Sequence, residues 1–115
     1  MPETRAPKID HHIAIASLLI DIQAEMANLN IWEDESPPEE ALRSTQPFCI
    51  DTLSFSQWLQ FIFIQRLRHM IDNNIPLPKQ SNIAAMAEEY FKGLNIASDL
   101  LIKQLKNIDQ LLEDS

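Results

Sequence analysis

The chain has 115 residues, with one glycine, one cysteine and a formal net charge of −8. This length fits one domain spanning residues 1–115, and a single glycine argues against an all-β fold or a glycine-rich phosphate loop. The acidic balance offers no basic stripe to neutralise phosphate, which excludes direct binding of nucleic acid.

The first predicted element is a helix from about residue 9 or 10 to Leu29. Asp10 is placed to act as its N-cap, and residues 1–8 are expected to be disordered. Apolar residues recur at the i, i+3/i+4 and i+7 spacing of a buried stripe, namely Ile15, Leu18, Leu19, Ile22, Met26 and Leu29. Trp32 extends this stripe one step beyond the end of the helix.

An acidic segment follows, with five carboxylates between Glu33 and Glu40. Ser36-Pro37-Pro38 stops any helix, so Glu33–Arg43 is expected to be an exposed loop or a short turn. A solvated, solubilising loop is the first interpretation of these acids, and a docking patch for a basic partner is the alternative.

Residues 44–53 form a polar, proline-containing loop that runs without a spacer into an apolar helix, so the loop must be ordered. If it is structural, Phe48 and Ile50 fill the end of the bundle, Thr45 and Gln46 satisfy backbone groups, and Asp51 caps the helix. The alternative is that this loop is a binding surface.

The second helix begins at a capping box formed by Ser54 and Gln57, with Asp51 and Thr52 as rival caps, and ends near Asn73. Its polar residues are predicted to share one narrow face (Gln57, Gln60, Arg68 and Asp72), and apolar residues cover the rest. Only a helix packed on several sides needs so much apolar surface, so it is the central helix of the fold.

Arg66 falls in the apolar arc of this helix when residues are placed at 100° intervals. Its guanidinium either reaches water past a helix edge or is held by a buried partner, with Asp51 or Glu89 as the expected carboxylate. The held charge is the reading we favour.

The last two helices are predicted from Ser81 or Asn82 to Lys92, and from about Ile96 to Glu113. Gly93 is placed to end the first, and Asn95 is a candidate cap for the second. In the second, Leu101, Leu105, Ile108 and Leu112 keep the core spacing, while Lys103, Lys106 and Asp109 are expected in solvent. The predicted fold is therefore all-α, a single small four-helix bundle with an ordered loop packed at the start of the central second helix.

Several segments resemble the YqcC-like family of small bacterial proteins: Ser44-Thr45-Gln46-Pro47-Phe48, Asp51-Thr52-Leu53, Trp58-Leu59-Gln60, Arg66, Pro76-Leu77-Pro78 and Met86-Ala87-Glu88-Glu89. The resemblance covers roughly Trp32 to Leu112 and implies a cytoplasmic helical bundle without an assigned activity. Family members are often encoded beside a tRNA pseudouridine synthase, which implies a supporting role in tRNA modification. The family pattern has a proline before the arginine, where this chain has Gln65, so a helix kink expected there is in doubt.

Catalytic and metal-binding patterns are weak. His11 and His12 point about 100° apart on a helix and cannot chelate one metal as an i, i+4 pair would, and His69 is alone, so all three are expected at the surface or an interface. Cys49 sits between apolar residues, which disfavours a thiolate nucleophile, and the neighbouring Glu88 and Glu89 diverge. We expect no enzyme activity, no cofactor and no metal.

The location predicted for the chain is the cytoplasm. Its lone cysteine cannot form an internal disulfide and suits a reducing compartment. The N-terminal residues do not have the pattern of a signal peptide, and no apolar run is long enough to span a bilayer.

Two functions remain. The preferred one is a non-catalytic interaction module, either a homodimer or an adaptor for a larger enzyme such as the pseudouridine synthase, because the second helix has more apolar surface than three short neighbours cover. The alternative is a small-molecule or peptide site floored by Trp58, Ile62, Arg66 and Tyr90, in which Arg66 holds an anionic group. The candidate binding residues are Thr45, Gln46, Phe48, Asp51, Trp58, Arg66 and Tyr90.

Overall fold

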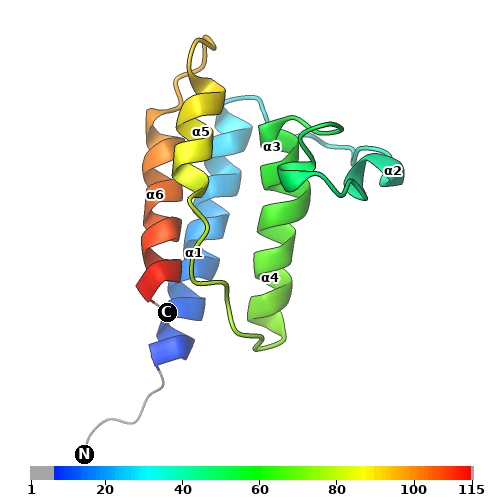
Figure 1. Ribbon diagram of the computed structural model, residues 1–115. Coiled ribbons are helices and arrows are strands. Elements are labelled where there is room, and N and C mark those ends of the chain that lie inside the picture. Colours follow the sequence, from blue (N-terminus) through cyan, green and yellow to red (C-terminus); the bar gives the residue numbers. More distant parts are fainter. Residues whose placement is uncertain (1–6, 115) are drawn as a thin grey trace, which may run out of the picture.

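The computed structural model describes residues 7–114, which form an all-α bundle with no strand in that range (Figure 1). Its long elements are α1 (Pro7–Asn28), a continuous second helix over residues 55–72, α5 (Ile83–Phe91) and α6 (Asp99–Asp114). The second helix comprises α3 (Phe55–Trp58), a π-helical turn (Leu59–Phe63) and α4 (Ile64–Asp72). Two short elements, α2 (Glu39–Leu42) and a 3-10 turn (Pro47–Cys49), lie in the loop between α1 and α3. The predicted four-helix bundle is confirmed.

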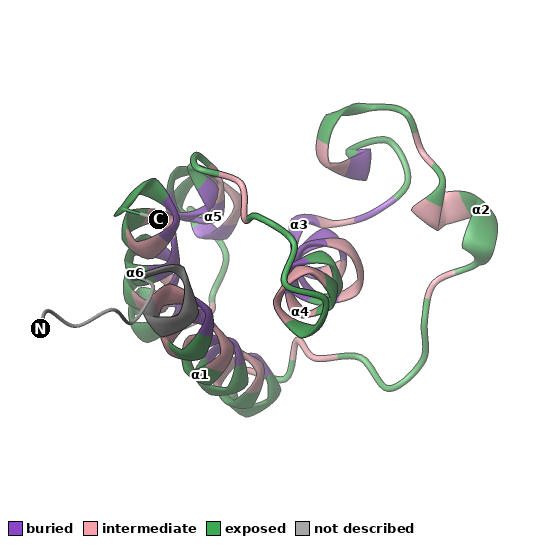
Figure 2. Cartoon of the chain, turned by 90° about the horizontal axis from the view of Figure 1, so that it is seen from below, coloured by how far each residue is buried: buried purple, intermediate pink, exposed green. Residues whose placement is uncertain are grey.

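The second helix is central in the sense that it lies between two layers (Figure 2). On one side are α1, α5 and α6, in which α6 packs extensively on both α1 and α5. On the other side is the loop of residues 31–54, which carries α2 outward and returns to the start of α3. None of the helices in the described part of the chain is long and apolar enough to cross a membrane.

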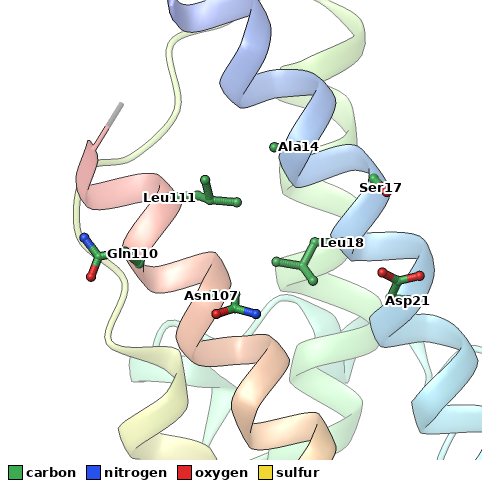
Figure 3. Close-up of a pocket in the computed structure, with 7 residues that line it drawn as sticks. All are labelled: Ala14, Ser17, Leu18, Asp21, Asn107, Gln110 and Leu111. Carbon is green, nitrogen blue, oxygen red and sulfur yellow. The ribbon is translucent and has the colours of Figure 1, made fainter.

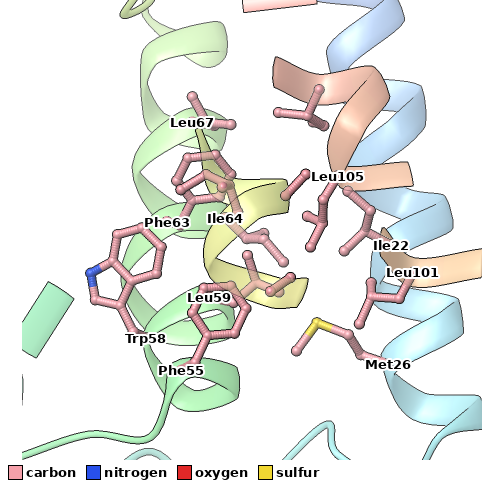
Figure 4. Close-up of a cluster of buried hydrophobic side chains, with 14 of the residues drawn as sticks. Ile22, Met26, Phe55, Trp58, Leu59, Phe63, Ile64, Leu67, Leu101 and Leu105 are labelled. Carbon is pink, nitrogen blue, oxygen red and sulfur yellow. The ribbon is translucent and has the colours of Figure 1, made fainter. Parts of the chain in front are cut away.

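The core lies between α1, α6 and the inner face of the second helix (Figure 4). Leu59, Ile64 and Leu67 of the second helix face Ile22 and Met26 of α1 across it, and Leu101 and Leu105 of α6 complete the cluster. The buried stripes predicted for the first and last helices are confirmed, since their central members are fully buried: Ile15, Leu19, Ile22, Met26, Leu101, Leu105, Ile108 and Leu112.

The start of α1 differs from the prediction. The helix already includes Pro7, a residue that suits the first turn because its missing N–H would have no partner there. Asp10 therefore lies inside the helix and is not its N-cap. The predicted disorder does not extend to Pro7 and Lys8, and residues 1–6 and 115 lie outside the described residues.

The predicted capping box is confirmed. The Ser54 hydroxyl accepts the Gln57 N–H at 3.2 Å, and the Gln57 side-chain oxygen accepts the Ser54 N–H at 2.9 Å. The helix then widens into the π turn, where the Ile64 N–H donates to the Leu59 carbonyl. The Gln65 amide donates to the Gln60 carbonyl at 3.3 Å, so this residue supplies a partner for a backbone group beside the wide turn.

Gln60 does not lie on an exposed polar face as predicted. It is 3% exposed, and its amide makes two hydrogen bonds with the backbone of Glu33, accepting the N–H at 2.9 Å and donating to the carbonyl at 2.8 Å. A side-chain amide can bind both the N–H and the carbonyl of one residue in this way because it has one donor side and one acceptor side. Gln60 thus attaches the start of the acidic segment to the second helix.

The third and fourth helices follow the prediction with changes at their starts. Gly93 has φ 82° just after α5 and ends that helix as predicted. The fourth helix begins at Asp99, three residues later than the predicted Ile96, and Ser98 rather than Asn95 precedes it, with its carbonyl accepting the Ile102 N–H at 2.9 Å.

The sequence suggested that Asp109 is a solvated residue of α6. In the structure it caps α5 instead. Its two carboxylate oxygens accept the N–H groups of Ile83 and Ala84 at 2.9 Å each, and the Ser81 hydroxyl donates to the same carboxylate. The carboxylate thus satisfies N–H groups of the first turn, where negative charge is also favourable. One side chain of α6 therefore caps the first turn of α5 and links the two helices.

Replacing Asp109 should destabilise the bundle. We expect Asp109→Ala to lower the free energy of unfolding by about 2 kcal/mol, because it removes a charged cap from partly buried N–H groups. Chemical denaturation followed by circular dichroism measures this. Asp114→Ala at the exposed end of the same helix is the matched control and should change stability by less than about 0.5 kcal/mol; equal effects of the two substitutions would contradict the capping role.

Candidate binding groove around Phe48

The 3-10 turn before α3 has an unusual backbone. Phe48 and Cys49 have φ values of 56° and 50°, in the left-handed region that bulky residues rarely adopt. Hydrogen bonds from the Cys49 N–H to the Gln46 carbonyl and from the Ile50 N–H to the Pro47 carbonyl, at 3.0 and 3.1 Å, hold the turn. Such a conformation persists only where neighbouring contacts impose it.

Packing supplies those contacts. The Phe48 ring meets Trp58 edge-on with centroids 4.9 Å apart, and the Cys49 side chain is buried. The next residue, Ile50, is 70% exposed. The turn therefore directs one large apolar side chain inward and leaves another in water.

The flanks of the turn are tied by polar contacts. The Ser44 hydroxyl donates to the Asp51 carboxylate and accepts the Gln46 N–H, the latter at 3.0 Å. The Thr52 hydroxyl donates to the Ala41 carbonyl at 2.7 Å and so joins the turn to α2. Asp51 braces the loop and does not cap the second helix, so Ser54 is the cap and Asp51, the rival candidate, is not.

Phe48 separates two cavities. The larger, about 430 Å³, lies between the turn, the start of α3 and α5, and is lined by Phe48, Ile50, Leu53, Ser54, Phe55, Met86, Glu89 and Tyr90. The smaller, about 250 Å³, lies between the second helix and the segment leading into α5, and is lined by Phe48, Trp58, Phe63, Arg66, Leu67, Pro78, Gln80, Ser81 and Ile83. We call the larger one the Phe48 groove.

The structure brings only some of the predicted binding residues together. Phe48, Trp58 and Arg66 share the smaller cavity, while Tyr90 lies in the Phe48 groove, with its ring 5.5 Å from that of Phe55. The predicted single pocket floored by Trp58, Ile62, Arg66 and Tyr90 is therefore wrong, since Ile62 lines neither cavity and Tyr90 is on the other side of Phe48. Thr45, Gln46 and Asp51 are exposed in the loop beside these cavities and line neither of them.

Sequence reasoning missed the groove residues Ile50, Leu53, Phe55 and Met86. The structural interpretation of the loop places Ile50 with Phe48 at the end of the bundle, because apolar and polar residues alternate there. The alternation of apolar and polar residues in this loop does not reveal which side chain faces inward, because the left-handed turn reverses the chain between them.

Arg66 is exposed, so the predicted buried, held charge is wrong. No hydrogen bond or ion pair joins its guanidinium to another residue within the described range 7–114. The π turn explains the error: it adds one residue to a turn and rotates the residues after it by about 100° from their places on a regular helix. Arg66 therefore turns out of the apolar arc and reaches the rim of the smaller cavity.

The apolar surface that motivated the adaptor prediction is not on the second helix. Large apolar side chains are exposed on α1, where Ile13 and Ile20 are 64% and 65% exposed, and at Ile50 of the turn. A further cavity, of about 360 Å³, lies between α1 and α6 (Figure 3). Its lining mixes Leu18 and Leu111 with four polar side chains and contains none of the predicted site residues.

The histidine prediction needs one correction. His12 is buried in α1, with Nε2 lacking a hydrogen-bond partner, so it is not a surface residue. Within residues 7–114, no three His, Cys, Asp or Glu side chains cluster as metal ligands would.

Comparison with known proteins places these features in a family. The model of the DUF446 family, described as tRNA pseudouridine synthase C, matches residues 14–111. The solution NMR structure of protein YqcC from E. coli is 28% identical, superposes with a TM-score of 0.80, and is matched over 90% of this chain and 89% of that one.

Two further relatives differ in length. A Haemophilus influenzae protein named only as uncharacterized is 37% identical over 83 residues, which cover 72% of this chain and 78% of that protein. A protein of Pectobacterium carotovorum subsp. carotovorum named tRNA pseudouridine synthase C is 32% identical over 75 residues. That match covers 65% of this chain but only 20% of the Pectobacterium protein.

The position of Arg66 leads to a stability prediction. Arg66→Met should change the free energy of unfolding by less than about 0.5 kcal/mol, because an exposed cation without a partner contributes little. Arg68→Met is the matched comparison: Arg68 donates to the Gln23 side chain at 2.6 Å, and we expect a loss of about 1 kcal/mol. Urea denaturation of both variants tests this, and a loss of about 2 kcal/mol in Arg66→Met would restore the held-charge interpretation.

Proposed function

This chain belongs to the YqcC-like DUF446 family, and we propose that it is a non-catalytic binding module whose partner is a tRNA pseudouridine synthase. The Pectobacterium protein of that name is the observation behind this proposal. A segment similar to this chain makes up about a fifth of it, and the other four fifths lie outside the match. A protein named as a synthase thus contains a segment similar to this chain.

The small relatives suggest how the same pair would work when it is divided between two chains. The E. coli protein YqcC is matched over 89% of its length, so it consists almost entirely of the module. Two domains that share a polypeptide in one organism have a high effective concentration for each other, and separate chains need a docking surface in its place. This chain would need such a surface to bind the synthase.

The Phe48 groove is the surface that best supports the proposal. It is a concave, largely apolar site with an exposed isoleucine at its edge, whereas the cavity between α1 and α6 has a mixed lining. Buried apolar and aromatic anchors supply most of the binding energy at protein interfaces. Ile50 is in a position to act as such an anchor, with Phe48 and Tyr90 as the walls.

The proposal predicts a complex. The chain, mixed with the tRNA pseudouridine synthase C of the same organism, should co-migrate with it in size-exclusion chromatography. Ile50→Ser should raise the dissociation constant by about tenfold or more, because it removes an apolar anchor while leaving the core intact. Isothermal titration calorimetry measures both values.

The matched control is Leu100→Ser, which removes an apolar side chain that is 50% exposed at the start of α6. It should leave the affinity unchanged. Light scattering on the same samples reports whether the chain alone is a homodimer, the other form of interaction module, for which the exposed Ile13 and Ile20 of α1 would be the contact. Absence of any complex with the synthase would refute the proposed function.

A second candidate function rests on the smaller cavity. Aromatic rings of Phe48, Trp58 and Phe63 line it, and the unpaired guanidinium of Arg66 stands at its rim. This arrangement suits a small anionic molecule with an apolar body, such as an aromatic carboxylate.

This candidate predicts that a panel of anionic metabolites contains at least one that raises the melting temperature of the native chain, because a ligand that binds only the folded state stabilises it. The same compound should lose its effect on Arg66→Met. An unchanged thermal shift in that variant would exclude Arg66 as the anion-binding group.

A further inference from the structure

The Phe48 groove has a chemical character that restricts what fills it. Its volume of about 430 Å³ lies within the range of about 300–1,000 Å³ typical of binding pockets. Its polar lining groups are those of Ser54, Glu89 and the Tyr90 hydroxyl, and the Ser54 hydroxyl is already engaged by the Gln57 N–H and by Ser56. A polar metabolite would find few groups to orient it, whereas an apolar side chain of a protein would lose only contact with water.

Charge restricts the occupant further. The Glu89 carboxylate lines the groove with its side chain 75% exposed, and Asp51 directly follows Ile50. One base lies near these two acids: the Lys92 ammonium is 4.0 Å from the Glu89 carboxylate. The groove is therefore apolar inside and acidic at its rim.

We propose that the groove binds an apolar side chain on a basic segment of the synthase, and that this segment belongs to the surface that contacts tRNA. The inference rests on the synthase partnership proposed above. An enzyme that acts on tRNA must neutralise phosphates with lysine and arginine, so its basic surface is where tRNA lies. The module, with a net charge of −8, has the same sign of charge as the tRNA backbone.

The consequence is competition. The module and tRNA occupy overlapping basic surface and exclude one another from the synthase. Occupancy by the module then limits adventitious binding of nucleic acid, while a tRNA that also fits the active site displaces it. The apolar groove gives the module a specific contact that charge alone would lack.

Two double variants separate the groove rim from the overall charge. The rim variant is Asp51→Asn and Glu89→Gln, and the distal variant is Asp72→Asn and Glu113→Gln. All four residues are exposed, and both variants reduce the negative charge by the same amount. Fluorescence anisotropy of the labelled chain with the synthase gives the dissociation constants, and circular dichroism checks that both variants are folded.

We expect the rim variant to bind the synthase about tenfold more weakly and the distal variant less than about threefold more weakly, because close charge pairs act at the contact and remote ones act only on the approach. Unlabelled tRNA should displace the wild-type chain from the synthase. The labelled chain without synthase should show no binding to tRNA, so that the displacement reports competition for the enzyme.

The outcomes are distinguishable. If the wild-type chain does not bind the synthase, the proposed function fails, and the inference fails with it. If it binds but both double variants lose affinity equally, or neither loses any, the acidic rim is not part of the contact. If it binds and tRNA leaves the complex intact, the contact lies away from the tRNA surface, and only the inference is overturned.

Discussion

The loop between α1 and α3 must be held against the second helix, because that helix carries apolar residues on two sides and the other helices cover only one of them. Gln60 does this at one end through two hydrogen bonds with the Glu33 backbone, and Phe48 does it at the other by packing on Trp58. Without these attachments, Trp58 would lose the ring that packs against it from the loop side. The ordered loop, the central position of the helix and both cavities beside Phe48 all depend on these two attachments.

The packing of Phe48 on Trp58 also shapes the candidate binding surface. Phe48 packs on Trp58 through a left-handed backbone, and Ile50, two residues later, is 70% exposed at the edge of the groove. The groove wall and the exposed isoleucine are thus two results of one turn. Strain stored at a turn of this kind is common at binding sites, where surrounding contacts over-determine an unfavourable backbone. Here the contacts are the Trp58 ring, the buried Cys49 and the polar bonds that flank the turn.

The other end of the bundle shows how a single side chain can substitute for local sequence signals. Asn82 precedes α5 in a left-handed conformation and provides no side-chain cap. Asp109 of α6 provides it from the neighbouring helix, which fixes α5 relative to α6 as well as starting it. Since α5 supplies Met86, Glu89 and Tyr90 to the Phe48 groove, this cap indirectly sets the far wall of the groove.

The sequence by itself determined the elements whose causes are local. The apolar stripes of α1 and α6, the Ser54–Gln57 capping box and the stop at Gly93 follow from spacing and backbone preference within one turn or one helix. Tertiary structure alone decided the roles of Gln60, Arg66 and Asp109, which looked like a surface amide, a buried cation and a solvated acid. Gln60 and Asp109 bind backbone groups 27 and more than 20 residues away in the chain, and Arg66 is turned outward by a π turn that helical periodicity does not reveal. The roles of Gln60 and Asp109 could not be predicted because a hydrogen bond to a distant partner leaves no periodic trace in the sequence, while burial of a helix face does.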